Sequence, residues 1–402
     1  MRSSFMVVVA VALMSLWSVR QVWLVNAWSL QYTRHAFNVV AQKLAVKEPP
    51  VGHARAAFWL AHVALRSGNP ALAENFIASQ AAQSDPFAMR LMADARLAQG
   101  DFSGALAIWQ QAGEVTLLMG VASQALRAGH LEEALMAYSA VWRLDTESGT
   151  LPLANFLFDN MQDYGRAEYV LRQSLVLFPN SISWPVWSHR LGDTLRVQKR
   201  WDEAVAAYKS TIIRNPDDWL AHIGLGWARY ERGDGLQAVI REFQYAIDAP
   251  ESQGGGHIAI AHVLTREMRF NEAEVWFVQA LALNPDVQWW YVDRGNAARQ
   301  AGNLALALEV YQKALVRFPD FSPIFYEMAY AYQLNKQPAQ AITAIEQALV
   351  FMLPPEAFYY VRAGSIYEWV GDNNQALHAY CQALLIDSQN AVAYDGVQRL
   401  GK

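Results

Sequence analysis

The sequence predicts an all-α protein, a solenoid of antiparallel helix pairs preceded by a hydrophobic N-terminal helix. Three observations predict this class. An apolar stretch occupies the first 30 residues, a spaced set of small, aromatic and proline residues recurs through the rest of the chain, and turn signals separate the recurring segments. With 402 residues, of which 53% are hydrophobic, the chain is too long for one ordinary compact domain and can bury an extended core.

The apolar stretch begins near the first residue. Residues 5–19 are all apolar or small, and a second apolar run, residues 22–30, follows Arg20. A helix of the 15 residues from 5 to 19 spans only about 22 Å, less than the roughly 30 Å hydrocarbon core of a bilayer, so a spanning helix must include Arg20 near one end. Arginine is tolerated there because its long side chain reaches the interface. Three tryptophans, whose rings favour that depth, lie close by: Trp17, Trp23 and Trp28.

We interpret residues 1–30 as a single-pass membrane anchor and residues 31–53 as a juxtamembrane helical linker. Two alternatives stay open. A cleaved secretory signal suits the charged start and apolar core, and Val25-Asn26-Ala27 is a weak cleavage site. A soluble helix that caps the solenoid suits the helical spacing of apolar residues up to Leu44. Basic residues flank the segment almost evenly, so the side of the membrane is open, with the exported side slightly favoured.

A ladder of five positions recurs from residue 185 onward. It consists of a small residue, an alanine 12 residues later, an aromatic residue 4 further on, a second small residue 3 further on and a proline 5 further on. The first clear instance is Gly192, Ala204, Tyr208, Thr211 and Pro216. Later instances keep the spacing with substitutions; one has Glu242 at the aromatic position and Phe243 one place late.

Each position of the ladder has a structural reason. The small residue and the alanine let two antiparallel helices approach closely. The aromatic residue lies one turn after the alanine on the same helix face and fills the space between neighbouring hairpins. The proline ends the second helix, and glycines such as Gly233, Gly302 and Gly371 supply the turn within a hairpin.

This pattern resembles the tetratricopeptide repeat family, whose unit has 34 residues. The second-helix alanine serves as a marker and predicts ten units: Ala73, Ala105, Ala134, Ala167, Ala204, Ala238, Ala273, Ala307, Ala341 and Ala376. We expect degenerate repeats in residues 54–184, six regular repeats in residues 185–390 and a capping helix in residues 391–402. The resemblance implies a right-handed superhelix whose ligands lie in a concave groove lined by the first helices.

Composition and spacing argue against several kinds of site. The net charge of −5, with basic residues spread along the chain, argues against nucleic acid. His257 and His262 are five apart, which puts them on different helix faces, so we expect no metal site. Cys381 is alone and is expected in the core, and Gly254-Gly255-Gly256 is expected to be a flexible loop between repeats. We expect no catalytic residues, no cofactor and no enzyme activity, because the repeats leave no room for a separate catalytic domain.

The candidate partner-binding groove follows from the first-helix positions near each small residue. These positions carry an aromatic, sparsely charged set that suits an extended peptide or a sugar chain: Trp227, Tyr230, His262, Trp289, Asn296, Arg299, Tyr326 and Tyr330. Aromatic residues at helical spacing are more often packed between repeats than in contact with a ligand, and that alternative stays open.

The predicted function is a non-enzymatic, membrane-tethered scaffold that binds a protein or extended peptide in this groove. The alternative is a glycan-recognition or accessory module that acts in trans with a glycosyltransferase or an envelope polysaccharide system. Repeats of this kind resemble those attached to glycosyltransferases, and aromatic side chains stack on sugars. In both cases the membrane contact is through the N-terminal helix.

Overall fold

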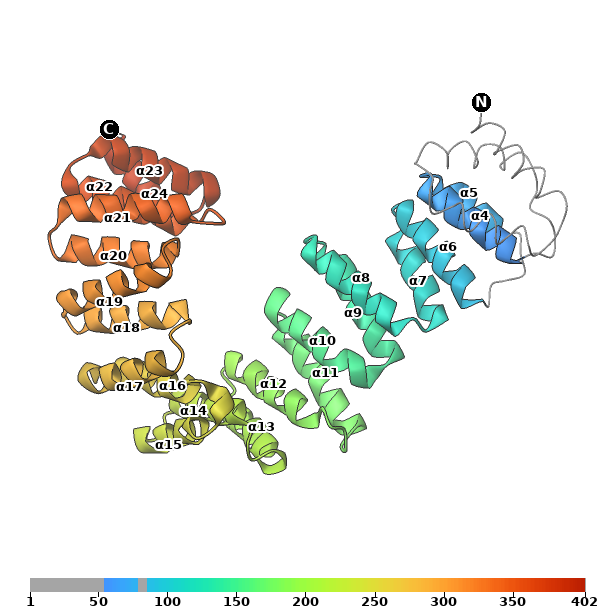
Figure 1. Cartoon of the computed structure of the whole chain (residues 1–402), viewed down its shortest axis with the longest axis horizontal. Helices are drawn as coiled ribbons and strands as arrows, with labels where there is room; N and C mark the ends of the chain where they lie inside the picture. Colours follow the sequence, from blue (N-terminus) through green and yellow to red (C-terminus); the bar gives the residue numbers. More distant parts are fainter. Residues whose placement is uncertain (1–53, 79–84, 402) are drawn as a thin grey trace. The chain divides into compact units, whose positions relative to one another are not determined.

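The structure is a computed structural model that describes residues 54–78 and 85–401. All regular elements in these residues are helical, and successive helices pair and stack as an all-α repeat solenoid (Figure 1). The chain divides into two compact units between Gln198 and Lys199. Each unit is described by itself.

Unit 1 contains four helix pairs and a further helix. The helices are α4 (Ala54–Arg66), α5 (Pro70–Ala78), α6 (Pro86–Ala98), α7 (Phe102–Ala112), α8 (Val115–Arg127), α9 (Leu131–Leu144), α10 (Thr146–Asn155), α11 (Tyr164–Leu177) and α12 (Trp184–Val197). A π-helical turn, η1 (Phe156–Asn160), extends α10. Consecutive helices pack as pairs, α4 on α5 through α10 on α11, and α12 packs on α11.

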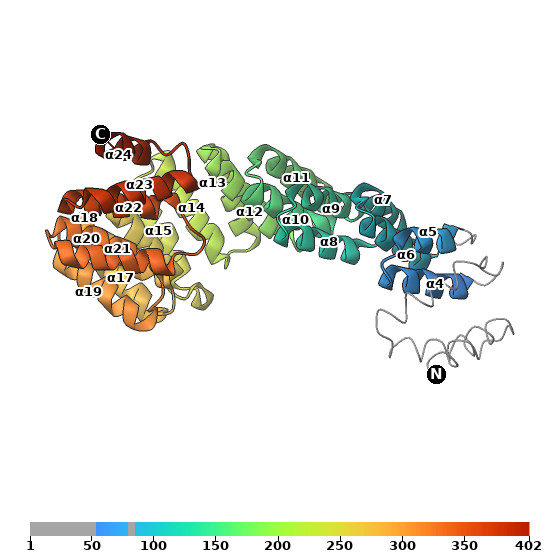
Figure 2. The same ribbon diagram turned by 90° about the horizontal axis from the view of Figure 1, so that it is seen from above.

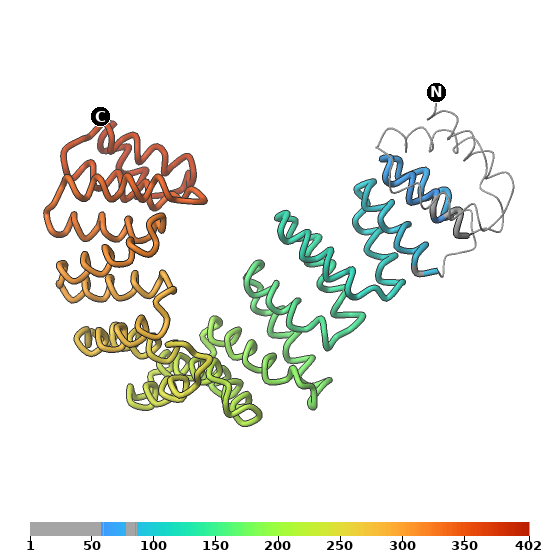
Figure 3. Tube along the Cα trace, in the orientation of Figure 1, coloured from blue at the N-terminus to red at the C-terminus, as the bar shows by residue number. Residues whose placement is uncertain are grey.

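Unit 2 begins with α13 (Trp201–Arg214) and continues with five helix pairs and a last helix. The helices are α14 (Trp219–Arg232), α15 (Leu236–Ile247), α16 (Gly255–Arg266), α17 (Phe270–Leu283), α18 (Gln288–Gln300), α19 (Leu304–Arg317), α20 (Ser322–Leu334), α21 (Pro338–Phe351), α22 (Ala357–Val370), α23 (Asn373–Ile386) and α24 (Ala391–Leu400). A short 3-10 turn, η2 (Pro250–Ser252), follows α15. The tube trace reverses direction between the two helices of a pair, so paired helices are antiparallel (Figure 3). Figure 2 shows the ribbon of the same helices from above.

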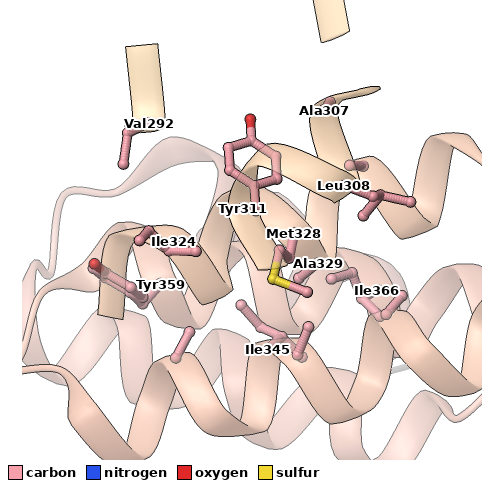
Figure 4. Packing of buried hydrophobic residues seen from close by; sticks show 14 of the residues in the cluster. Val292, Ala307, Leu308, Tyr311, Ile324, Met328, Ala329, Ile345, Tyr359 and Ile366 are labelled. Carbon is pink, nitrogen blue, oxygen red and sulfur yellow. The ribbon is translucent and has the colours of Figure 1, made fainter. Parts of the chain in front are cut away.

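The predicted ladder is the core of the repeats. Nine of the ten marker alanines are fully buried, and the aromatic or aliphatic side chains four residues after them are buried as well. In α19 and α21 these are Tyr311 and Ile345, which lie in one cluster with Met328 of α20 (Figure 4). The burial follows from the helical period, because residues four apart share one face.

Glycines of the first helices lie directly against the aromatic rings of the second helices. A methyl group on Gly295 of α18 would overlap the ring of Tyr311. Tyr380 of α23 is enclosed from two sides, because methyl groups on Gly364 of α22 and on Gly396 of α24 would both overlap its ring. The ring therefore contacts its own hairpin and the helix that follows, as the aromatic position predicts.

One marker is wrong by one residue. Ala238 is only partly buried, whereas Val239, Phe243 and Ala246 are fully buried and keep the spacing of 4 and 3. The reason is an extra residue: Leu236, the first residue of α15, comes ten residues after Gly226, whereas Leu304 of α19 comes nine after Gly295. Phe243 therefore fills the aromatic position and lies against Gly226.

Glu242 consequently occupies a different face of α15 from the one predicted. Its carboxylate lies 3.0 Å from Nδ1 of His222 and 2.6 Å from Nη1 of Arg229, both on α14. Glu242 and His222 are buried. Burial of a carboxylate is tolerated when it is paired and hydrogen-bonded, and this cluster supplies both.

The helix ends match the turn signals. Gly233 and Gly371 follow α14 and α22 with φ of 94° and 92°, the left-handed region that glycine adopts without strain. Asp218 caps α14, because its side chain accepts a hydrogen bond of 3.0 Å from the backbone N–H of Ala221.

Gly254-Gly255-Gly256 is not a flexible loop, and that expectation is wrong. Gly255 and Gly256 are the first residues of α16, and Gly254 caps it. A methyl group on Gly256 would come within 2.6 Å of the backbone oxygen of Phe243. The absence of side chains therefore serves the close approach of α16 to α15. The expectation that Cys381 is a core residue is also wrong, since it is exposed on α23.

Unit 1 has a local irregularity near its end. Pro152 lies inside α10, where it lacks the backbone N–H of the helical hydrogen-bond ladder, and the helix changes to the π-helical turn four residues later. Asp163 then caps α11 through the N–H of Arg166. The interval between Ala167 and Ala204 is 37 residues, the longest between marker alanines.

The predicted anchor, residues 1–30, and the linker, residues 31–53, lie outside the described residues. Across residues 54–78 and 85–401, no helix has the length and apolar character needed to cross a bilayer. The boundaries of the degenerate repeats, the regular repeats and the capping helix stay predictions.

The contact between glycine and aromatic ring predicts opposite effects of one substitution at two sites. Gly295→Ala places a methyl group in the Tyr311 ring, so we expect it to lower the free energy of unfolding by about 1–3 kcal/mol. Gly120→Ala, in the exposed middle of α8 with open space around it, should raise that free energy by about 0.5–1 kcal/mol. Urea unfolding followed by circular dichroism measures both. Stabilisation by Gly295→Ala would contradict the role of the contact.

Candidate functional site

The first helices of unit 2 form a continuous row. α14 contacts α16, α16 contacts α18, α18 contacts α20, and α20 contacts α22. We call the surface of these five helices the first-helix face. It contains all eight side chains of the predicted groove, and the structure arranges them in four groups.

The first group lies where α14 meets α16. The rings of Trp227 and Tyr230 meet edge to face at a centroid distance of 6.1 Å. The guanidinium of Arg266 lies 4.9 Å from the Trp227 ring centre, a cation–π contact. The Tyr230 hydroxyl donates a hydrogen bond of 2.9 Å to Glu267. Burial is the main cause that raises the pKa of Tyr230, and the bond to Glu267 adds to it.

The second group joins α16 to α18. Nε2 of His262 lies 3.0 Å from Oδ2 of Asp293, and both side chains are partly exposed. The His262 ring also packs edge-on against Phe277, with a centroid distance of 5.9 Å. His262 therefore bridges two repeats through its own contacts.

The third group is a hydrogen-bonded cluster around Asn296 on α18. The side-chain oxygen of Asn296 accepts one hydrogen bond of 2.8 Å from the Tyr311 hydroxyl and another of 3.0 Å from Arg299. Arg299 also lies 3.5 Å from Glu327 of α20. Burial raises the pKa of the Tyr311 hydroxyl, and the negative charge of Glu327 raises it further. The hydroxyl is therefore a constant donor to Asn296.

Tyr330 of α20 extends this cluster toward α22. Two arginines contact its ring, with the guanidinium of Arg299 4.6 Å and that of Arg362 3.9 Å from its centre. Arg362 also donates a hydrogen bond of 3.4 Å to the Tyr326 hydroxyl. Aromatic faces attract cations, so one ring links three successive first helices.

The fourth group is a pocket of about 520 Å³. It lies among the N-terminal parts of α18, α20 and α22 and the loops that precede α20 and α22. Two predicted groove residues, Trp289 and Tyr326, line it. Trp289 is 56% exposed, so much of its ring surface faces solvent. Pockets of this size lie within the range of small-ligand sites.

The prediction missed the long charged side chains that link the repeats. Arg266 and Arg362 cover the aromatic rings of neighbouring helices, and Phe321 and Phe358 complete the pocket with the predicted aromatic residues. Arg266, Arg362 and Phe321 lie outside the spacing by which the groove was selected, whereas Phe358 lies six residues before Gly364, as Trp289 lies six before Gly295. The two arginines could have been found by also considering arginine side chains long enough to reach a ring of a neighbouring repeat.

In residues 54–78 and 85–401, no three histidine, cysteine, aspartate or glutamate side chains lie close enough together to bind one metal ion. The chemistry that the first-helix face offers is therefore stacking, hydrogen bonding and charge.

Models of the tetratricopeptide repeat match residues 189–253, 259–323 and 359–390. The chain is a tetratricopeptide repeat protein. The predicted recognition is thereby confirmed, and these repeats are scaffolds for protein–protein interaction.

This tetratricopeptide repeat protein is similar to several known proteins. Protein O-mannosyl-transferase TMTC3 of Homo sapiens is 24% identical over 190 residues, which are 44% of this chain and 20% of that protein. The chain therefore spans about a fifth of the length of the curated relative that it matches. A tetratricopeptide repeat protein from Parabacteroides merdae is 17% identical, with 64% of this chain and 99% of that chain covered and a TM-score of 0.45. The APC/C hetero-tetramer Cut9–Hcn1 is 13% identical, with 94% and 95% covered and a TM-score of 0.41.

The cluster around Asn296 predicts a structural role for this residue of the repeat protein. Asn296→Ala leaves the Tyr311 hydroxyl and the Arg299 guanidinium without their shared acceptor, so the free energy of unfolding should fall by about 1–3 kcal/mol. Asn271→Ala, on the exposed surface of α17, is the control and should change it by less than about 0.5 kcal/mol. Urea unfolding measures both. Equal effects of the two substitutions would contradict this role. So would a loss from Asn296→Ala that is as large in the Tyr311→Phe protein, which lacks the hydroxyl, as in the unchanged chain.

Proposed function

We propose that this protein is a membrane-tethered scaffold that holds a protein partner, as an extended peptide segment, on its first-helix face. The observation that carries this proposal is the unbroken row from α14 to α22, on which aromatic rings and charged groups alternate. The proposed superhelix is right-handed, with a hydrophobic N-terminal helix before it. Residues 1–30 are the proposed tether.

The first-helix face suits a peptide because its side chains are already held in place. Cation–π contacts and hydrogen bonds fix Trp227, Arg266, Tyr330 and Arg362 before a partner arrives. A surface that is ordered beforehand loses little conformational entropy on binding. Aromatic and arginine side chains are also the types that most often dominate binding energy at protein interfaces.

Alanine substitution of two central rings tests the face. The partner is first identified by chemical crosslinking of the full chain in its native membrane, and its affinity is then measured. Trp227→Ala and Tyr330→Ala should each weaken binding by about 2 kcal/mol, roughly 30-fold, because each removes a ring and leaves the arginine that stacks on it without that contact. Tyr245→Ala, an exposed tyrosine on the second helix α15, is the control and should leave affinity unchanged.

Circular dichroism and urea unfolding must show that each variant keeps its fold, since Trp227 also packs on Phe243. Folded Trp227→Ala and Tyr330→Ala proteins that recover the partner as well as the unchanged chain does would refute binding on this face.

The tether has its own test. The full chain should stay with the membrane during extraction with alkaline carbonate, whereas a chain of residues 31–402 should be released, because the apolar segment of residues 1–30 is the proposed span. The intact mass of the membrane form shows whether the segment is cleaved. Release of the full, uncleaved chain would contradict the tether. If the chain stays with the membrane, protease protection in intact cells shows on which side of the membrane the repeats lie.

A second candidate function has a specific observation in its favour. The relative named as a protein O-mannosyl-transferase matches over 190 residues, which supports a role as a glycan-recognition or accessory module that acts with a glycosyltransferase in trans. The exposed ring of Trp289 suits stacking on a sugar. Recovery of a glycan without protein in the crosslinking experiment would favour this candidate over the first.

A further inference from the structure

The pocket at the N-terminal ends of α18, α20 and α22 has a distinct chemistry. Its walls contain six aromatic side chains: Trp289, Phe321, Tyr326, Phe351, Phe358 and Tyr359. Three carboxylates line it as well, those of Asp320, Glu327 and Glu356. The residues that line the pocket, all in the described part of unit 2, include no lysine, arginine or histidine.

Edge-to-face contacts hold the aromatic walls. Trp289 meets Phe321 at 87° with a centroid distance of 5.1 Å, and Tyr326 meets Phe358 at 83° with a distance of 5.3 Å. Such pairs restrict the rings to defined orientations. Trp289 and Phe358 are also about half exposed, so a ligand can reach their surfaces.

The carboxylates give the pocket a net negative charge. Glu327 is paired with Arg299, but Asp320 and Glu356 are exposed, and neither is in an ion pair in the part of the chain that the structure describes. Three helices begin at the pocket, α18 at Gln288, α20 at Ser322 and α22 at Ala357. Each helix start carries roughly half a positive charge, about one and a half in total, which is less than the two full negative charges.

Arg362 is the one further cation to weigh. It contacts Tyr326, with its guanidinium 5.3 Å from the ring centre, but it is closer to Tyr330 and is not among the residues that line the pocket. A ligand in the pocket therefore meets aromatic faces and carboxylates rather than arginine.

We propose that this pocket receives a lysine or arginine side chain of the peptide that lies on the first-helix face. The proposal rests on the proposed function, since it names which part of the partner this part of the face selects. Aromatic faces attract a cation, and the effect is stronger when the cation is partly removed from water. The carboxylates of Asp320 and Glu356 then pair with the ammonium or guanidinium group. An anionic group has no cationic side chain to meet there.

The test is a selection of peptides from a random library displayed on phage, with the full chain in detergent as the target. Peptides selected by the unchanged chain should share a lysine or arginine at one position. The double variant Asp320→Asn/Glu356→Gln should bind such a peptide about 10-fold more weakly, since each exposed ion pair contributes a factor of a few. Its binding should also depend less on salt, because two charges are gone.

Matched controls separate the pocket from general charge effects. Asp217→Asn/Glu251→Gln removes one aspartate and one glutamate from exposed positions of unit 2 outside the pocket, and affinity should stay within twofold. Trp289→Ala should weaken binding several-fold, and Trp289→Phe should restore most of it. Circular dichroism checks that every variant is folded; Glu356 makes no side-chain capping bond to α22, so its replacement removes none.

The outcomes distinguish this proposal from the one it rests on. Peptides that bind through the first-helix face but share no basic residue, or that bind the pocket variant as well as the unchanged chain, would overturn the pocket assignment and leave the scaffold intact. Failure to select any peptide would overturn both. Mannotetraose is the probe for a sugar site. If it binds, and if Trp289→Ala abolishes this binding while Asp320→Asn/Glu356→Gln retains it, the pocket assignment is overturned in favour of a sugar site.

Discussion

The packing of one large side chain of each second helix, a ring in most of them, against a small residue of a first helix is the constraint on which the rest of this fold depends. Tyr380 shows it most clearly, because its ring lies between Gly364 of its own hairpin and Gly396 of the next helix. One side chain thereby sets the spacing within a pair and the spacing between pairs. Stability is shared between neighbouring repeats, as in other linear repeat arrays.

This constraint involves only part of each first helix and leaves the rest of the first-helix face for the proposed binding of a partner. The small residues face the second helices, and the side chains that link neighbouring repeats lie elsewhere on the first helices. Arg266, Arg299 and Arg362 cover rings of adjacent helices without taking part in the packing of glycine against ring. The packing of glycine against ring and the arginine contacts of the first-helix face are thus supplied by different residues of the same helices.

Much of the fold could be predicted from spacing alone, because repeated contacts of the backbone require repeated small residues. The marker alanines and the aromatic positions of α19 and α23 were found in this way. The candidate site was less accessible to such reasoning. Spacing gives the face on which a side chain lies, but not how far it reaches, so it found Trp289 and Tyr330 and missed Arg362, which crosses from one repeat to the next.

The errors have physical causes of the same kind. Ala238 was taken as a marker because a spacing of 34 is usual, but one extra residue before α15 passes that role to Val239. Cys381 was placed in the core because it follows Tyr380, although adjacent residues on a helix point about 100° apart. The glycines of residues 254–256 were taken for a loop because glycine is common there, whereas close helix packing also requires it.

The extra residue before α15 also gives one repeat an identity of its own. Because the helix face is shifted by one residue, Glu242 lies beside His222 and Arg229 and forms a buried polar cluster between α14 and α15. In an array of near-identical repeats, a first helix could pack against the second helix of another repeat during folding. Glu242 would be buried without its partners beside any other helix, so a mismatched pair of helices would cost free energy that the pairing of α14 with α15 does not.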